Sequence, residues 1–238
     1  MVTNLKPRIV GGKNLHSVRQ KITTGTDYKL SDALDFLISN SYTKFDQTLD
    51  IVVKLGVDPK QSDQVVRGVT VLPAGTGKLT RIAVVCKDDK ISLAKNAGAD
   101  IVGSSDIIDA IKAGKIDFDV CITSPDMVPA LAQVAKILGP KGLMPSAKTG
   151  TVTNDLEGAI ARAKAGQVNF RIDKAAIVHA GIGKLSFGVD KLTENVKALM
   201  NEVVKAKPQG SKGAYIKDVY VSSTMGPALR VVLSDLSL

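Results

Sequence analysis

The clearest pattern along the chain is a strict alternation of apolar and polar positions at residues 48–55. Positions 49, 51, 53 and 55 are Leu, Ile or Val, whereas Thr48, Asp50 and Lys54 occupy the other side of an extended segment. Neither Pro nor Gly interrupts the run, as is typical of a strand. The pattern predicts the central strand of a sheet with one face on a core and one polar face open to a partner. The alternative interpretation is an ordinary solvated sheet face.

The middle of the chain has a different pattern of apolar and polar residues, in which apolar strands are expected to alternate with helices. Three short apolar runs, at 80–86, 100–103 and 119–123, are of the kind that is buried on both faces of a sheet. Helical patterns lie between and after them, including one at 126–138 and one with a cap at Asn154. This order predicts a parallel sheet covered by helices.

The two ends of the chain resemble each other more than they resemble the middle. Alternating strands return in the last third, and helices are expected to begin at Ser31 and Asp190. The predicted fold class is therefore α/β and α+β, with two domains. Residues 1–75 and 167–238 form a discontinuous α+β domain, and residues 76–166 form an α/β domain inserted into it.

Two chain crossings would join these domains, and glycine occurs at both. Gly75 and Gly77 lie on the first crossing and Gly166 lies on the second. Because glycine adopts a wide range of backbone angles, these three residues are expected to form a hinge.

The charge of the chain is concentrated in its outer parts. The formal net charge of the 238 residues is +9, of which residues 1–75 carry +3, residues 167–238 carry +4 and the middle only +2. A basic body of this kind favours nucleic acid or another anionic surface as the partner. No apolar run approaches the roughly 20 residues that span a bilayer, so no membrane partner is expected. Cys86 and Cys121 lie in apolar runs, which fits a reducing compartment.

No motif supports catalysis, a metal or a cofactor. AGTGKLT at 74–80 lacks both the leading glycine and the hydroxyl residue after the lysine that a phosphate loop requires, so a flexible connector is the better interpretation. No G-x-G-x-x-G follows the first middle strand. His16 and His179 are the only histidines, and neither has a second ligand at metal spacing. The chain is therefore expected not to be an enzyme.

The polar segments suit a folded RNA better than single strands. With no Trp and 4% aromatic residues, the chain has little material for stacking single-stranded bases. Folded RNA is recognised instead by its shape, its phosphates and its 2′-hydroxyls. The segment 222–226 would offer hydroxyls and exposed backbone to a ribose edge, although an ordinary hairpin turn is the alternative.

The segment ILGPKGLMPSAKTGTVT at 137–153 closely resembles the signature of the ribosomal protein L1 family. Further segments match the same family in the right order, and the resemblance covers residues 28–232, whereas the first 27 residues match only weakly. These segments are KFDQTLDIVVKLGVDPKQSDQVVRG at 44–68, LPAGTGK at 72–78, AGADIVG at 97–103, IDFDV at 116–120, KAGQVNFRIDK at 164–174 and VYVSSTMGPALRV at 219–231.

The resemblance implies a two-domain fold with both termini in an RNA-binding domain and a Rossmann-like domain inserted. It implies a constituent of the large ribosomal subunit that binds a structured rRNA stalk element beside the exit site and helps deacylated tRNA to leave. Bacterial members also repress their own mRNA by binding its leader. We expect a protein of the bacterial or organellar type, monomeric when free and associated with ribosomes in the cytoplasm or an organelle. The alternative is an extraribosomal regulator that holds an mRNA leader.

The resemblance also implies the residues that contact RNA, carried over at matching positions. Asp50 stands where glutamate is common, and its shorter carboxylate keeps the acceptor but changes its reach. The pair at 222–223 stands where threonines are common, which keeps the hydroxyls. The implied RNA-binding residues are Lys44, Phe45, Thr48, Asp50, Asp173, Lys174, His179, Ser223, Thr224, Met225 and Gly226.

Overall fold

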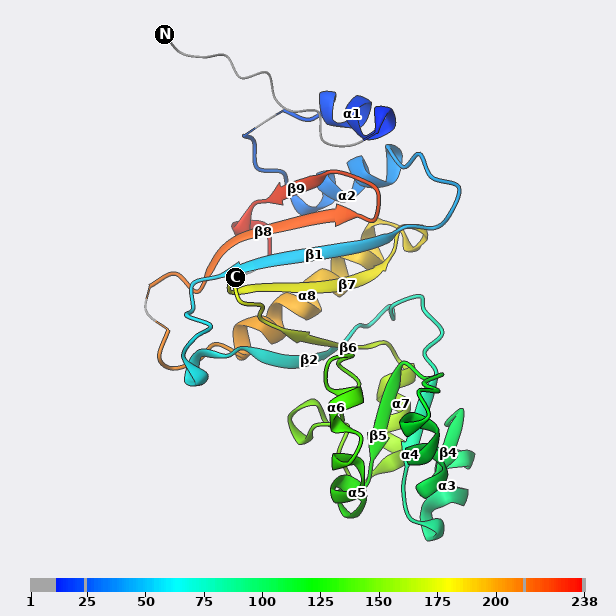
Figure 1. The fold of residues 1–238 in the computed structure, drawn as a ribbon. Helices are drawn as coiled ribbons and strands as arrows, with labels where there is room; N and C mark the ends of the chain where they lie inside the picture. Colours follow the sequence, from blue (N-terminus) through cyan, green and yellow to red (C-terminus); the bar gives the residue numbers. More distant parts are fainter. Residues whose placement is uncertain (1–11, 24, 212, 237–238) are drawn as a thin grey trace. The chain divides into compact units, whose positions relative to one another are not determined.

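The computed structural model describes residues 12–23, 25–211 and 213–236. The chain divides into two compact units, each built around its own sheet (Figure 1). The terminal unit consists of Met1–Arg67 and Phe170–Leu238, and the middle unit consists of Gly68–Asn169. The mixture of helices and sheets confirms the predicted fold class.

The terminal unit contains a four-stranded antiparallel sheet in the order β7-β1-β8-β9. Figure 1 shows the cyan β1 between the yellow β7 and the orange β8, which come from distant parts of the chain. The central strand is therefore the one predicted from the alternating pattern. The strands are β1 (Thr48–Leu55), β7 (Ile177–Lys184), β8 (Ile216–Ser223) and β9 (Ala228–Val231).

Two helices, α2 (Leu30–Ser39) and α8 (Val189–Lys205), cover one face of this sheet (Figure 1). The apolar positions of β1 point towards them and are essentially inaccessible, as the alternation predicted. The expected cap at Asp190 is wrong by two residues: Gly188 stands at the N-cap, and Asp190 lies in the first turn, where its charge favours the helix dipole. A third helix, α1 (Lys13–Gln20), belongs to the same unit.

A β-bulge shapes the pairing of β1 with β7. Leu49 pairs with Gly183 and Asp50 with Gly181, which leaves Ile182 as the extra residue. The buried Asn195 on α8 donates a hydrogen bond to the Ile182 carbonyl at 2.8 Å. A fully buried amide therefore satisfies a backbone group close to the bulge.

The middle unit contains a parallel sheet in the order β4-β3-β5, formed by β4 (Ile101–Gly103), β3 (Ile82–Val85) and β5 (Val120–Thr123). Every residue of β3 is buried, and its two faces belong to two separate apolar clusters. This confirms the expectation of strands buried on both faces. Helices on the two sides complete the unit: α3 (Ile91–Asn96), α4 (Ser105–Lys112), α5 (Val128–Ala132), α6 (Ala135–Leu138) and α7 (Leu156–Lys164).

Two local expectations for the middle unit are wrong. The helix expected at 126–138 is divided into a 3-10 turn, α5 and α6, because the amides of Gln133 and Val134 bond three residues back instead of four. The cap of α7 is Asp155 and not Asn154, since the Asp155 carboxylate accepts a hydrogen bond from the Gly158 amide at 3.0 Å.

The segments that join the units pair with each other as β2 (Arg67–Val71) and β6 (Gln167–Arg171). The division between the units falls within these two strands, whereas the domain boundaries expected at 75/76 and 166/167 stay a prediction. Gly75, Gly77 and Gly166 all have positive φ angles, which favour glycine. Their role as a hinge also stays a prediction.

Candidate nucleic-acid interface

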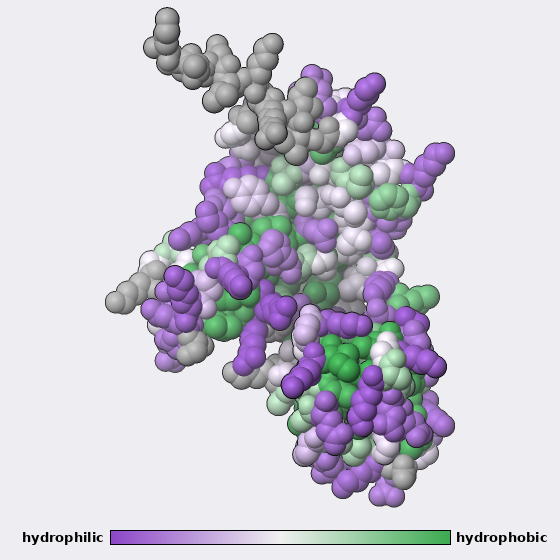
Figure 2. Space-filling view, viewed as in Figure 1, coloured by the Kyte–Doolittle hydropathy of each residue, from purple (hydrophilic) through white to green (hydrophobic). Residues whose placement is uncertain are grey.

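The sheet face opposite α2 and α8 brings together polar residues from three strands, and we call it the polar face. Asp50 pairs with Ser222 on β8, Val52 pairs with His179 on β7, and Thr48 pairs with Lys184. These side chains are exposed or half-buried. On the face seen in Figure 2, hydrophilic residues of the terminal unit lie next to groups of hydrophobic residues. Such a mixed surface suits phosphate and ribose contacts.

The turn Thr224–Met225–Gly226 follows β8 and is fixed to the start of β1. The Thr48 amide donates to Thr224 Oγ1 at 3.0 Å, and the Thr224 amide donates to the Thr48 carbonyl at 3.1 Å. The structure therefore brings together Thr48 and Thr224, which are 176 residues apart in the sequence. The predicted site residues of this turn, at 224–226, thus lie beside the predicted site residue Thr48.

Two residues that the sequence analysis did not single out hold the main chain of Met225. Gln47 Oε1 accepts from the Met225 amide at 2.9 Å, and the Tyr42 hydroxyl donates to the Met225 carbonyl at 2.7 Å. Gln47 is only 1% exposed. Gln47 lies on the same side of the alternating pattern as the apolar positions of β1. A buried polar side chain needs a hydrogen-bond partner, so this inward position could have marked Gln47 as a residue with a structural role.

Ser223 does not lie on the polar face. It is 5% exposed and points towards the core, and Ser222 takes the outward position beside Asp50. A Cβ atom on Gly226 would overlap with Ser223 Oγ, so a side chain at 226 requires the Ser223 hydroxyl to move. The structure thus gives Ser223 a packing position under the turn.

Two apolar side chains are exposed at the predicted site. Phe45, in the segment before β1, is 53% exposed, and Met225 is 48% exposed. Lys44 is also exposed. Exposed apolar groups next to lysine and hydroxyl groups are able to pack on ribose and base edges while the lysine contacts phosphate.

Asp50 is a half-buried carboxyl on the polar face. Burial raises the pKa of Asp50, and the positive charges of His179 and Lys184 oppose this by smaller amounts. Lys184 also donates to Thr48 Oγ1 at 3.0 Å. Lys184 is a cation of the polar face that the sequence analysis missed, because Gly181 and Gly183 precede it and no alternating pattern marks its side.

Asp173 and Lys174 lie in the turn before β7, away from the Thr224 turn. The Asp173 carboxylate accepts from the amides of Ala175 and Ile177 at 2.8 and 2.9 Å, and the hydrogen bond from Ile177 is the main reason that its pKa is lowered. His179 Nε2 lies 3.5 Å from the same carboxylate. Asp173 lies beside Ile177, the first residue of β7. At about 3.3 Å per residue, Ile177 is about 23 Å from Lys184 at the other end of β7, where Thr48 pairs. The predicted residues therefore form two groups along the polar face.

The described part of the chain has little that suggests other chemistry. Burial raises the pKa of the Cys121 thiol to about 12, which keeps it protonated near neutral pH. Within residues 12–236, apart from 24 and 212, no cluster of His, Cys, Asp or Glu is placed to hold a metal ion. Every helix among the same residues is too short or too polar to span a bilayer.

Comparisons with known proteins identify relatives that cover nearly the whole chain. Residues 37–227 match the model of the ribosomal protein L1p/L10e family. The large ribosomal subunit protein uL1 of Rickettsia akari (strain Hartford) is 54% identical over 230 residues, which cover 97% of this chain and 96% of the relative. The proteins of the same name from Rickettsia canadensis (strain McKiel) and Rickettsia bellii (strain OSU 85-389) are 55% and 56% identical over 227 residues, covering 95% of each chain.

Proposed function

The chain belongs to the ribosomal protein L1p/L10e family, in its bacterial type, and from this premise we propose that it is a constituent of the large ribosomal subunit that binds structured rRNA through its polar face. The family is one of ribosomal proteins, in agreement with the expectation that the chain is not an enzyme. The observation that carries the proposal is the turn at Thr224–Gly226, which is fixed to Thr48 at the start of β1 and leaves Met225 exposed.

Different residues of the site suit different parts of an RNA strand. Lys44 and Lys184 supply positive charge for phosphates, which is the main source of affinity for RNA. Thr48, Ser222 and the carboxyl of Asp50 supply groups that hydrogen-bond a 2′-hydroxyl, the group that distinguishes RNA from DNA. Phe45 and Met225 give apolar contact at the end of the sheet where Thr224 lies.

The finer roles implied by the resemblance form part of the proposal. The bound rRNA is the stalk element beside the exit site, and the protein assists the release of deacylated tRNA there. The same polar face binds the leader of the protein's own mRNA and represses its translation. The protein is a monomer when free and otherwise associates with ribosomes in the cytoplasm. Cosedimentation with large subunits separates this proposal from an extraribosomal regulator, which would stay in the free fraction.

The direct test compares two changes from an exposed apolar residue to an acid. Met225→Asp places a negative charge at the proposed site, while the hydrogen bond from the residue 225 amide to Gln47 and the one from Tyr42 to its carbonyl can persist. Leu93→Asp makes the same change on α3 in the middle unit, at 49% exposure. Binding of the full chain to a stalk-like rRNA fragment is measured for both across a salt series.

We expect Met225→Asp to weaken binding by at least about tenfold, since one repulsive or lost contact of about 1.4 kcal/mol has this effect. Leu93→Asp is expected to bind like the original chain. The reverse result, with loss only in Leu93→Asp, would move the site to the middle unit and refute the assignment. Circular dichroism of both variants checks that the fold is retained.

A further inference from the structure

Helix α1 is packed onto the terminal unit close to the proposed RNA site. Val18 on α1 is buried, and Lys21, just after the helix, donates to the Asn40 side chain at 2.8 Å. Asn40 is the C-cap of α2, two residues before Tyr42. These contacts place α1 beside the loop that holds the Thr224 turn.

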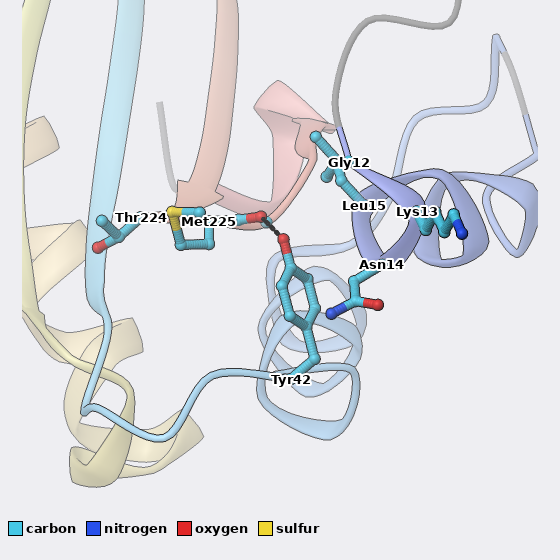
Figure 3. Close-up of a pocket in the computed structure, with 8 residues that line it drawn as sticks. Gly12, Lys13, Asn14, Leu15, Tyr42, Thr224 and Met225 are labelled. Atoms are coloured by element: carbon cyan, nitrogen blue, oxygen red, sulfur yellow. Dashed lines mark hydrogen bonds between the residues drawn. The ribbon is translucent and has the colours of Figure 1, made fainter.

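A pocket of about 600 Å³ lies between α1, Tyr42 and the turn at residues 224–226. Figure 3 shows Asn14 extending from α1 towards the ring of Tyr42, whose hydroxyl bonds to Met225, while Lys13 extends away from Tyr42. Gly12 and Leu15 complete the wall on the side of α1. Pockets of roughly 300–1,000 Å³ accommodate ligands of drug size, so this one has room for a nucleotide.

The charge of α1 favours a nucleic-acid backbone as the occupant. Residues 12–23 contain Lys13, Arg19 and Lys21 and no Asp or Glu, and Lys13 and Asn14 are exposed. An RNA strand in contact with Met225 would pass directly beside this wall, because the same pocket joins Met225 to α1. The sequence analysis gave this part of the chain no role, since the family resemblance is weakest there.

We propose that α1 is an additional wall of the RNA site, with Asn14 hydrogen-bonding the ribose or phosphate of a nucleotide in the pocket and Lys13 neutralising a phosphate at its rim. This inference rests on the proposed function and extends it to a helix outside the segments that carry the resemblance. Lysine contributes affinity that depends on salt, whereas the neutral amide of Asn14 contributes affinity that does not.

The test uses the full chain, a stalk-like rRNA fragment and three variants. Lys13→Gln removes the charge at the rim, and Asn14→Ala removes the amide while keeping a good helix former. Lys197→Gln is the matched control, because Lys197 is an exposed lysine on α8, which covers the other face of the sheet. Each dissociation constant is measured at several salt concentrations.

We expect Lys13→Gln to reduce the slope of log K against log salt by about 0.7–0.9, the value for one phosphate contact, beyond any change in the control. Asn14→Ala is expected to weaken binding about fivefold with an unchanged slope, as for one neutral hydrogen bond. If both variants bind like Lys197→Gln in affinity and slope while Met225→Asp still weakens binding, α1 is not part of the site and the proposed function stands. If Met225→Asp has no effect either, the proposed function fails as well.

Discussion

The hydroxyl of Thr224 lies between the amide and the carbonyl of Thr48. It accepts from Thr48 N at 3.0 Å and donates to Thr48 O at 3.2 Å. A hydroxyl has one donor and two acceptor lone pairs, so one lone pair stays available for a ribose 2′-hydroxyl. Thr224 therefore fixes the turn on β1, and we propose that the same oxygen accepts a hydrogen bond from RNA.

Thr224→Val tests this double role, because valine keeps the branched shape and removes the hydroxyl. We expect RNA binding to weaken about five- to tenfold and the free energy of unfolding to fall by about 1 kcal/mol, since two internal hydrogen bonds are lost. Filter binding and urea denaturation measure the two effects. Thr193→Val on α8 is the control and should leave RNA affinity unchanged. Equal affinity of Thr224→Val and the original chain would contradict the assignment.

The packing of Gly226 on Ser223 gives a second prediction, in which a substitution at Ser223 restores what a substitution at Gly226 loses. A Cβ at Gly226 would overlap with Ser223 Oγ, whereas the next atoms, Ser223 Cβ and Leu37 Cδ2, lie at 3.4 and 3.5 Å. Gly226→Ala is therefore expected to cost about 1–3 kcal/mol of unfolding free energy and to weaken RNA binding by displacing Met225.

The double variant Gly226→Ala with Ser223→Ala should recover most of both losses, because the overlapping oxygen is removed. Ser223→Ala alone should bind RNA nearly as well as the original chain, since the side chain is buried. Urea denaturation of the three variants measures the change in stability, and RNA titration measures the change in affinity. A double variant as impaired as Gly226→Ala would show that the backbone of the turn, and not the Ser223 side chain, excludes alanine.

The sequence predicted the sheet of the terminal unit well, because the period-two pattern of β1 is set by burial of one face. The same pattern marks Gln47 as inward, but only the structure shows that it holds the Met225 amide from a segment 178 residues away. The family resemblance placed Ser223 at the RNA, whereas the pleat of β8 turns Ser222 outward instead. Contacts between distant segments, such as Lys184 with Thr48, leave no local trace in the sequence.

The carboxyls of Asp50 and Asp173 should affect stability in opposite directions. Burial raises the pKa of Asp50, so its ionisation disfavours folding as the pH rises above about 4, the ordinary range of aspartate. Backbone hydrogen bonds lower the pKa of Asp173, so its ionised form favours folding above the same range, and this is lost as the pH falls through the lowered value.

We therefore expect Asp50→Asn to raise the free energy of unfolding at pH 7 and Asp173→Asn to lower it. The effect of Asp50→Asn should shrink as the pH falls towards about 4, and that of Asp173→Asn should shrink only at still lower pH. Urea denaturation at a series of pH values measures both. The two variants serve as controls for each other, and changes of the same sign at pH 7 would contradict the environments described for these carboxyls.

The contact between Gly75 and Gly166 gives the last prediction. A Cβ on Gly166 would lie 2.6 Å from Gly75 Cα, and the φ angle of Gly166 is +96°. Gly114 in the same unit has a φ of +81° but nothing within 4 Å of its Cβ position. Both positions disfavour a side chain through their backbone angles, and only Gly166 adds a steric overlap with backbone.

Gly114→Ala is accordingly expected to cost about 1–2 kcal/mol of unfolding free energy, and Gly166→Ala about 1–3 kcal/mol more. Urea denaturation of the two variants isolates the cost of the close approach, because the strain from positive φ is common to both. RNA affinity of the folded variants should stay unchanged, since the proposed site lies in the terminal unit. Equal costs for both alanines would mean that the two chain segments can separate at Gly75 and Gly166 without loss of stability, which is the behaviour expected of a freely opening hinge.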